Sequence, residues 1–366
     1  MNSQTSNGVR IAYLHGRPGP HPTHRKFAES VGGEFIYVDF KMRWQDKRKS
    51  ILYRFISGLV CAFTFPNKKS YNVFLVDNLH FYPVIMKILH LITRKQKIVA
   101  HMGSHTLYFI YAHRFSKFIE WMHLQALKRY DALICEGKMS EDLVKKILKE
   151  NTPKLYTVIN GIPTEHFPSE QAMTKGLSGK NILFIGHGPG EDRIWYKGLD
   201  IMLRAFELSY EKDQELTLTI VGDWDKKLIL NLLGTFSPNA WNAITFAGSA
   251  TNLGKYTRSA ALYLHCARGE AYGIAVLIAL ASGVPAIVSE WTGAKEVVEK
   301  ADNRLVVSLS PADVSHKINW YFKLSSSEKI ELSLRCTNTA KKYTEEKSIE
   351  FHKNMFLQME SDFRMI

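Results

Sequence analysis

Cysteine is scarce in this sequence, with four residues among 366. Cys61, Cys135, Cys266 and Cys336 lie far apart, and none belongs to a C-x-x-C pair. This spacing excludes a disulfide framework and a cysteine-based metal cage, so we expect buried free thiols in a reducing compartment.

A membrane-spanning segment and a secretory leader are also lacking. The apolar stretch 271–288 is interrupted by Gly283 and Pro285 and has no basic flanks, which excludes a transmembrane helix there. Residues 1–9 are polar, and the apolar run 11–14 is only long enough for a strand. No signal peptide is therefore predicted, and we expect a cytoplasmic location.

Acidic residues are few in the N-terminal half. Residues 1–166 hold 25 Lys and Arg against 12 Asp and Glu, whereas residues 167–366 hold 23 of each kind. The first half therefore carries the whole net charge of +13. Such a one-sided charge predicts an anionic partner, and nucleic acid, an anionic membrane and a lipid-phosphate acceptor all suit it.

What the chain does contain is an alternation of strand-like apolar runs with helical patterns, which predicts parallel α/β architecture. A Pro-, Ser-, Gly- and Thr-rich break at 164–179 separates two halves, as expected for a chain too long for one core. After Pro311 we expect only helices, ending in an amphipathic segment at about 348–363. Strands are predicted at 10–14, 35–39, 73–76, 98–101, 132–135, 155–159, 181–185, 216–221, 244–247, 261–265 and 285–288.

The most informative segment is 270–290. Its carboxylate, Glu270, precedes a tight Tyr272-Gly273 turn, and an uncharged helix and a buried strand follow. A helix N-terminus offers free N–H groups and a partial positive charge, which suits phosphate. A carboxylate beside it can accept hydrogen bonds from sugar hydroxyls, so the segment predicts a nucleotide-sugar site.

This segment resembles the signature of the retaining, family-four glycosyltransferases of the GT-B fold, in which Glu, a small residue, an aromatic and Gly precede an apolar helix, Gly-x-Pro and a strand. The match extends from Glu270 to Ser289. Ile278 departs from it, because the family has a second Glu there that usually holds the nucleotide ribose. The resemblance therefore leaves the base and the sugar of the donor undecided.

The resemblance implies two doubly wound Rossmann-like domains that face a cleft, with ligands at the carboxyl ends of the strands. We expect an acceptor-binding domain at 1–168, a nucleotide-sugar domain at 169–345, and a C-terminal helix at 346–366 that packs back towards the first domain. Other pieces resemble the family in the same order: the hinge strand and Asn-Gly turn at 158–163, and parts of the nucleotide domain at 184–186, 197–200, 218–223 and 246–248.

Lys197 matches the lysine that the family uses on the donor phosphates. A fixed cation there stabilises a leaving diphosphate more than it stabilises the ground state. The family also has an Arg where this chain has His187, and Arg193, in a loop at 188–196, is the candidate second cation. A solvated lysine at a helix start is the alternative for Lys197.

For Glu270 the resemblance implies a contact with the donor sugar, on the face where oxocarbenium-like charge develops. A buried carboxylate needs a cation or a ligand, and Arg268 is close enough in sequence to be that cation. A purely structural ion pair is the alternative. Backbone amides of Tyr272, Gly273 and Ile274 are expected to bind the distal phosphate.

In the first half, Gly16 and Gly19 follow the first strand in a Gly-Arg-Pro-Gly-Pro loop, where glycine lets backbone approach a ligand closely. The resemblance implies contact with the donor phosphates, and a surface turn is the alternative. His101 ends the fourth predicted strand, where the family often has a His near the donor sugar. Its imidazole suits a hydroxyl of donor or acceptor, although a core histidine has the same signature.

No metal site is predicted, because we identify no Asp-x-Asp motif of the metal-dependent glycosyltransferase kind and because His and Cys residues never cluster at ligand spacing. Helix dipoles and lysines can replace a divalent ion at a diphosphate. No cofactor is expected beyond the nucleotide-sugar co-substrate. The chain also lacks a nucleophilic elbow, and the resemblance implies a retaining, front-face transfer.

A basic amphipathic pattern at 41–65 predicts contact with an anionic membrane. Six cations flank an apolar stripe there, and each cation near such a surface contributes about 1 kcal/mol. An interior helix packed on the sheet has the same stripe.

The sequence as a whole favours a glycosyltransferase on the cytoplasmic face of a membrane, which moves a sugar from a nucleotide-diphosphate sugar to a lipid-linked or cell-surface glycan. The alternatives are another GT-B enzyme, such as a nucleotide-sugar epimerase or an inverting transferase, and a non-enzymatic nucleic-acid-binding protein that uses the basic half. Nucleic acid is the less suitable partner, because no aromatic RNA-binding signature is present and the cleft residues would have no role.

Overall fold

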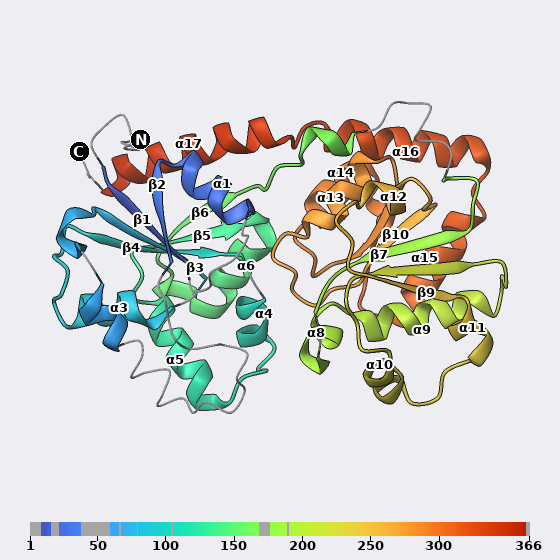
Figure 1. Ribbon diagram of the computed structural model, residues 1–366, viewed down its shortest axis with the longest axis horizontal. Helices are drawn as coiled ribbons and strands as arrows, with labels where there is room; N and C mark the ends of the chain where they lie inside the picture. Colours follow the sequence, from blue (N-terminus) through green and yellow to red (C-terminus); the bar gives the residue numbers. More distant parts are fainter. Residues whose placement is uncertain are drawn as a thin grey trace. The chain divides into compact units, whose positions relative to one another are not determined.

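A computed structural model describes residues 9–15, 22–37, 59–65, 67–78, 80–103, 105–167, 176–188 and 190–363. The chain forms two compact units (Figure 1). One comprises Met1–Ile159 and Ser348–Ile366, and the other comprises Asn160–Lys347. The backbone therefore passes between the units twice.

The first unit is built on a parallel sheet with the strand order β2-β1-β3-β4-β5-β6. The order of the strands reverses between β1 and β3, which is the position where open α/β sheets bind ligands. The strands are β1 (Ile11–His15), β2 (Gly33–Tyr37), β3 (Val73–Asp77), β4 (Lys97–Met102), β5 (Ala132–Glu136) and β6 (Lys154–Val158). Helices connect them at α1 (Pro22–Ser30), α3 (Phe81–Ile88), α4 (Thr106–Tyr111), α5 (Lys117–Leu127) and α6 (Gly137–Leu148), with 3-10 turns at Lys68–Ser70 and Lys149–Asn151.

The C-terminal helix α17 (Glu345–Phe363) completes the core of this unit. Its Met355, Phe356 and Met359 are buried in one cluster with side chains of α1, β1 and β3. Polar contacts add to the apolar ones, because His352 lies 3.2 Å from the Ser30 hydroxyl and its ring stands edge-on to Phe27. An amphipathic helix was expected over most of this range, and burial of its apolar face explains why it forms.

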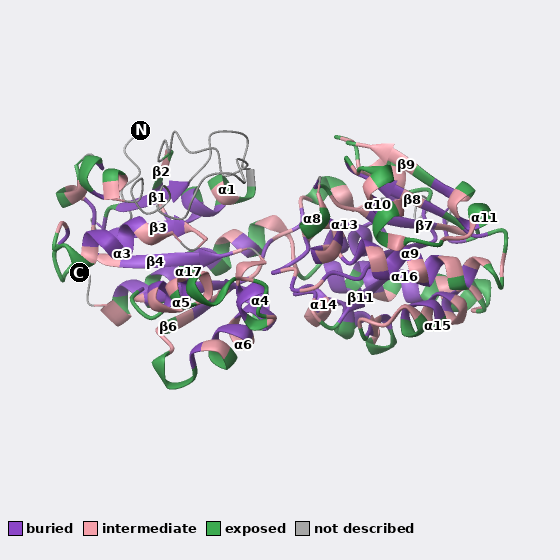
Figure 2. Cartoon of the chain, turned by 90° about the horizontal axis from the view of Figure 1, so that it is seen from below, coloured by how far each residue is buried: buried purple, intermediate pink, exposed green. Residues whose placement is uncertain are grey.

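The second unit has a parallel sheet with the order β12-β11-β10-β7-β8-β9, which reverses between β7 and β10. The strands are β7 (Asn181–Ile185), β8 (Thr217–Val221), β9 (Ile244–Gly248), β10 (Leu262–His265), β11 (Ala286–Ser289) and β12 (Val306–Val307). Most of these strands are buried, as both faces of a parallel sheet are covered by helices, whereas β9 is a partly exposed edge (Figure 2).

Helices of the second unit are α8 (Glu191–Tyr196), α9 (Leu199–Tyr210), α10 (Lys226–Leu233), α11 (Pro238–Asn242), α12 (Gly254–Thr257), α13 (Ile274–Ala281), α14 (Lys295–Ala301), α15 (Pro311–Phe322) and α16 (Ser326–Ala340), with 3-10 turns at Thr164–His166 and Asn303–Leu305. No helix in the described ranges is long and apolar enough to span a membrane.

All eleven predicted strands form, and the two-residue β12 is the strand that the sequence did not predict. The expected loop at 188–196 is wrong in part, because α8 forms within it directly after Gly190. Of the amphipathic segment 41–65, residues 41–58 lie outside the described residues, and 59–64 are helical.

Candidate active site

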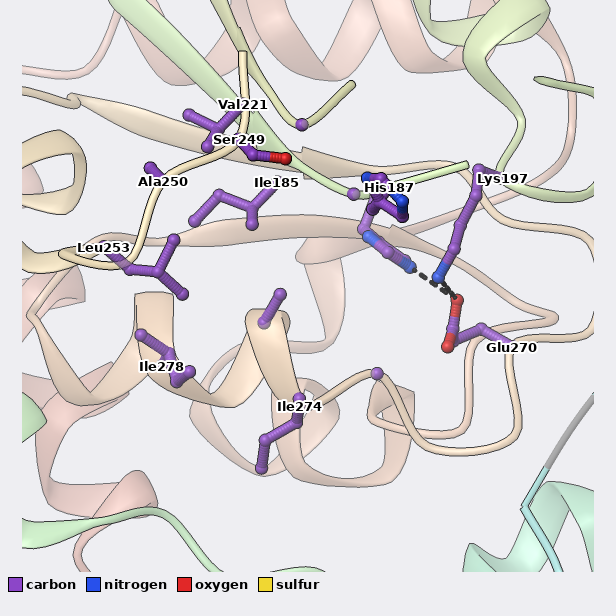
Figure 3. A pocket seen from close by; sticks show the side chains of 15 residues that line it. Ile185, His187, Lys197, Val221, Ser249, Ala250, Leu253, Glu270, Ile274 and Ile278 are labelled. Carbon is purple, nitrogen blue, oxygen red and sulfur yellow. Dashed lines mark hydrogen bonds and ion pairs between the residues drawn. The ribbon is translucent and has the colours of Figure 1, made fainter. Parts of the chain in front are cut away.

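A pocket of about 320 Å³ opens at the carboxyl ends of the central strands of the second unit. Ile185, Val221 and His265, the last residues of β7, β8 and β10, line it. Of these strands, β7 and β10 flank the point where the strand order reverses, so the pocket occupies the usual ligand position of a doubly wound sheet. Figure 3 shows the side chains that surround it.

Lys197 and Glu270 meet in this pocket. Their side chains point toward one another, and the Lys197 ammonium donates a hydrogen bond to Glu270 Oε2 (Figure 3). Only 12% of the Lys197 side chain and 17% of the Glu270 side chain are exposed. His265 Nε2 lies 3.4 Å from the same carboxylate oxygen. The predicted association of Lys197 and Glu270 with one cavity is therefore observed.

Glycine at 198 places Lys197 in the pocket. Gly198 has φ = +64°, and a β-carbon there would overlap the Cys266 carbonyl oxygen. The Arg268 amide donates to the Tyr196 carbonyl at 2.8 Å, so the turn that follows α8 lies directly against the end of β10. Only glycine allows this close approach.

Glu270 is held by the segment that follows β11. Its carbonyl accepts a hydrogen bond from the Gly293 amide at 2.8 Å, and the Ala294 amide donates to the Tyr272 carbonyl at 2.6 Å. A β-carbon on Gly293 would overlap the Ala271 carbonyl. Gly293 therefore lets the two segments pair and fixes the carboxylate beside Lys197.

Arg268 is not the partner of Glu270, and that expectation was wrong. Its guanidinium binds Asp200 through two hydrogen bonds of 2.8 Å and lies 4.9 Å from the Trp195 ring centroid. Gly269, between the two residues, has φ = +79°. In an extended chain, residues two apart point to the same side. The left-handed Gly269 interrupts that geometry, so the side chains of Arg268 and Glu270 do not meet.

The electrostatics of the pocket favour an ionised Glu270. Burial raises the pKa of this carboxyl, but the Lys197 charge and the hydrogen bond from His265 outweigh burial and hold the pKa well below its ordinary value. Burial lowers the pKa of His265, and the nearby carboxylate opposes that shift only in part. The site therefore contains a carboxylate, an ammonium and an imidazole whose pKa lies below its ordinary value.

The N-terminus of α13 forms a second wall. Gly273 caps the helix with φ = +86°, and Gly273, Ile274 and Ala275 all line the pocket. The first N–H groups of an α-helix have no acceptor within the helix, and the helix dipole adds positive charge at that end. This wall is suited to an anion such as a phosphate.

The rest of the pocket is apolar next to a polar rim. Ile278 lies on the same face of α13 as Ile274, and Ile185, Val221 and Leu253 face it across the cavity (Figure 3). The position where the resembling family has a carboxylate is thus part of an apolar wall.

The rim is formed by exposed polar groups at the ends of β7, β8 and β9. Asp223 accepts hydrogen bonds from the Ser249 amide at 3.1 Å and the Ser249 hydroxyl at 2.6 Å, and these bonds lower its pKa. His187 Nδ1 lies 3.7 Å from the same carboxylate. Asp223-Trp224-Asp225 has an Asp-x-Asp spacing, but Asp225 caps α10 by accepting from the Leu228 amide, so the two carboxylates have separate roles.

The remaining expected donor residues are placed as follows. Tyr272 is buried and does not line the pocket. Arg193 lies on α8, where its guanidinium is 5.6 Å from the Tyr196 ring, and it also does not line the pocket. Gly16 and Gly19 lie outside the described residues.

His101 belongs to the first unit and is 1% exposed. Its Nδ1 lies 3.2 Å from the Tyr13 hydroxyl and its Nε2 lies 3.2 Å from Glu136 Oε1, while Phe27 stacks on the ring. These contacts are those of a core histidine at the end of the sheet.

The sequence missed His265, Ser249 and the apolar side of the pocket. His265 ends a predicted strand next to the strand that precedes Lys197, and this position is the signal that could have identified it. Ser249 gave no such signal, because its role depends on a hydrogen bond to a residue 26 positions earlier.

Comparison with known proteins shows what the chain resembles in sequence and fold. Residues 179–323 match the family model described as glycosyl transferases group 1. A segment of 160 residues is 26% identical to the phosphatidyl-myo-inositol mannosyltransferase of Mycobacterium tuberculosis, covering 42% of this chain and 40% of the relative. The match thus spans less than half the length of the curated relatives.

Solved structures resemble the chain over nearly its whole length. Sucrose-phosphate synthase from Thermosynechococcus elongatus has a TM-score of 0.73 at 14% identity, covering 97% of this chain and all of its own. The E. coli trehalose-6-phosphate protein bound with UDP-2-fluoro glucose has a TM-score of 0.68 at 12% identity, covering 98% and 99%. At these identities the likeness concerns the fold, and it confirms the expected GT-B architecture of two Rossmann-like domains. Residues 179–323 are therefore similar to the glycosyl transferases group 1 family, in a chain with the GT-B fold.

Proposed function

We propose that this protein is a glycosyltransferase that moves a sugar from a nucleotide-diphosphate sugar to a glycan or lipid-linked acceptor. The observation that carries the proposal is the Lys197–Glu270 pair beside the N-terminus of α13, at the strand-order reversal of the second unit. One cation and one helix N-terminus suit a diphosphate, and one carboxylate suits a sugar. The family match of residues 179–323 supports the same activity.

In the proposed reaction, the bond between the anomeric carbon and the diphosphate oxygen breaks, and its electron pair stays on the diphosphate. Lys197 and the first N–H groups of α13 stabilise the charge that develops there. Glu270 remains ionised and faces the positive charge that develops on the sugar. The acceptor hydroxyl forms the new bond to carbon on the face that the diphosphate leaves, and its proton passes to the leaving phosphate. This front-face transfer retains the anomeric configuration.

The proposed machinery at the diphosphate requires no metal ion, because Lys197 and the helix dipole supply its positive charge. The identity of the base and of the sugar in the donor is a more specific part of the proposal. The E. coli structure contains UDP-2-fluoro glucose and an Anabaena structure of similar fold contains UDP and glucose, whereas the mycobacterial relative is named a mannosyltransferase. UDP and GDP sugars are therefore the first donors to test.

The acceptor and the membrane form a further part of the proposal. The basic charge of the first half and the lipid acceptor named for the mycobacterial relative both favour an anionic bilayer at the cytoplasmic face. On α5, Phe118 and Trp121 are 56% and 55% exposed and stack on one another, next to Lys117.

Flotation with anionic liposomes should recover the protein at low salt and lose it at high salt. The membrane part is wrong if the protein stays with the unbound fraction at low salt.

Nucleotide binding tests the central claim. In a thermal-shift panel of UDP, GDP, ADP and their sugars, at least one nucleoside diphosphate should raise the melting temperature, since a ligand that binds only the folded chain stabilises it. The product of that sugar donor should keep its anomeric configuration, as judged by NMR. An inverted product would support an inverting transferase instead, and an isomerised free nucleotide sugar would support an epimerase.

A further inference from the structure

A cluster of three ligating side chains lies in the first unit, outside the pocket that we propose for the donor. His15 is the last residue of β1, Asp77 is the last residue of β3, and His24 lies in α1. His15 Nε2 is 3.1 Å from both Asp77 Oδ2 and His24 Nδ1, and His24 Nδ1 is 3.6 Å from Asp77 Oδ1. The residues are 9 and 62 positions from His15, so their spacing in the sequence could not reveal the cluster.

We propose that His15, His24 and Asp77 bind a divalent transition-metal ion of the zinc class. Zinc takes imidazole nitrogen and carboxylate oxygen at about 2.0–2.2 Å in a tetrahedron, which places neighbouring ligand atoms about 3.3–3.5 Å apart. The 3.1 Å between the two imidazole nitrogens, and the 3.1 and 3.6 Å from these nitrogens to Oδ2 and Oδ1 of Asp77, fall close to these values. Two imidazoles and one carboxylate are also the ligand set of open zinc sites, in which a water or a bound molecule takes the fourth position.

Hydrogen bonding among the three groups explains the geometry less well. A neutral imidazole nitrogen either donates one hydrogen or accepts one. His15 Nε2 is equally close to two groups and can direct a hydrogen at only one of them, whereas a cation interacts with both. One cation between the two imidazole nitrogens and the carboxylate attracts all three groups at once.

The position in the fold is independent support for a ligand site. β1 and β3 flank the strand-order reversal of the first sheet, and doubly wound sheets bind ligands outside the carboxyl ends of the strands at that point. The His15 side chain is 4% exposed, whereas Asp77 and His24 are 16% and 25% exposed. The cluster is therefore anchored on its inner side and reachable from solvent on its outer side.

The neighbouring groups form a polar support for the site. The ring centroids of His24 and His101 are 5.9 Å apart, and His101 in turn lies 3.2 Å from Glu136. The ligands of this site belong to the first unit, whereas Lys197 and Glu270 belong to the second.

Metal binding by the full chain, expressed without a histidine tag, tests the inference. After chelator treatment and dialysis, isothermal titration with Zn²⁺ should show one saturable site per chain, and Co²⁺ should give the visible absorption of a low-symmetry nitrogen–oxygen site. Asp77→Asn and His24→Gln should each weaken binding by about tenfold or more, because each removes one ligand. His113→Gln is the matched control, since His113 forms an exposed 3.0 Å pair with Glu120 and belongs to no three-ligand cluster within the described residues.

Two outcomes would overturn the inference. One is the absence of saturable Zn²⁺ or Co²⁺ binding by the wild-type chain, which would identify the cluster as a hydrogen-bonded network. The other is unchanged binding in His24→Gln, the variant of the most exposed ligand and therefore the one expected to fold normally. Both readouts are independent of any sugar donor, so they are separate from the test of the proposed activity.

Discussion

At the scale of single residues, the pocket contains one ion pair whose two members depend on each other. Lys197 and Glu270 are both mostly buried, and each would be costly in the pocket without the other. A bound diphosphate adds a second negative group near Lys197, so the ammonium can serve the donor while it keeps Glu270 ionised. The low pKa of Glu270 means that its charge persists throughout the neutral pH range.

The first prediction concerns this pair. Lys197→Ala and Glu270→Gln should each lower kcat of sugar transfer by about tenfold or more, because they remove charge that faces the developing transition state. Initial rates with saturating donor are the measurement. Lys180→Ala is the matched control, since Lys180 is a lysine of the same unit that pairs with Asp213 and does not line the pocket. Near-normal kcat in both pocket variants would remove the site assignment.

The sequence located these two residues but not their contact. Lys197 and Glu270 are 73 positions apart, and the expected partner of the carboxylate was Arg268, its neighbour in sequence. A left-handed glycine between Arg268 and Glu270 reverses that expectation. Sequence reasoning identifies which groups carry charge, whereas the pairing of charges depends on turns whose φ angles it does not determine.

At the scale of elements, α13 determines what the pocket can bind. Its N-terminus presents N–H groups, while Ile274 and, one turn further along, Ile278 present an apolar face. Gly273 makes the turn that directs those N–H groups into the cavity. A β-carbon on Gly273 would lie 3.4 Å from its nearest neighbouring atoms, so a side chain there would meet backbone strain rather than a clash.

The second prediction follows from that strain. Gly273→Ala should lower the free energy of unfolding by about 1–2 kcal/mol, because φ = +86° is unfavourable for a residue with a β-carbon, and it should also weaken nucleoside diphosphate binding. Chemical denaturation and calorimetric titration measure the two effects.

Gly234→Ala provides the control for Gly273→Ala. Gly234 has φ = +66°, has open space around a β-carbon and ends α10 away from the pocket lining. It should show a similar loss of stability with unchanged nucleotide binding. Equal binding by both variants would show that the N-terminus of α13 is not part of the donor site.

The positions of strands were the part of this structure that the sequence predicted best. Parallel strands are buried on both faces and therefore form continuous apolar runs, which is why all eleven predicted strands are present. β12 was missed because two residues are too few for a pattern. α8 was missed because Gly188, Pro189 and Gly190 directly before it are typical of a loop.

At the scale of the whole molecule, α17 joins the end of the chain to the first unit. His352 is central to this attachment, since its ring nitrogens lie 3.2 Å from the Ser30 and Ser348 hydroxyls. Burial lowers the pKa of His352 from 6.5 to about 4, with a smaller effect from the nearby His101. The folded chain therefore favours the neutral imidazole.

The third prediction gives the sign of the resulting pH dependence. Between pH 6.5 and about 4 the unfolded chain binds a proton at His352 that the folded chain does not, so the stability of the α17 attachment falls as pH falls through this window. The maximum loss is about 3 kcal/mol. Hydrogen-exchange protection of α17, compared at pH 7 and pH 5, measures it. His352→Asn should remove this part of the pH dependence, and an unchanged dependence in that variant would contradict the assignment.

The first unit is discontinuous in the chain, and this has a consequence for how the protein is made. Its sheet is translated first, but the helix that closes its core is translated last, after the whole of Asn160–Lys347. All residues of the second unit are therefore made before the first unit receives its last helix. During synthesis the N-terminal sheet therefore lacks part of its apolar cover, and a chain cut off shortly before Ser348 would hold all strands of the second unit but leave the core of the first unit without Met355, Phe356 and Met359.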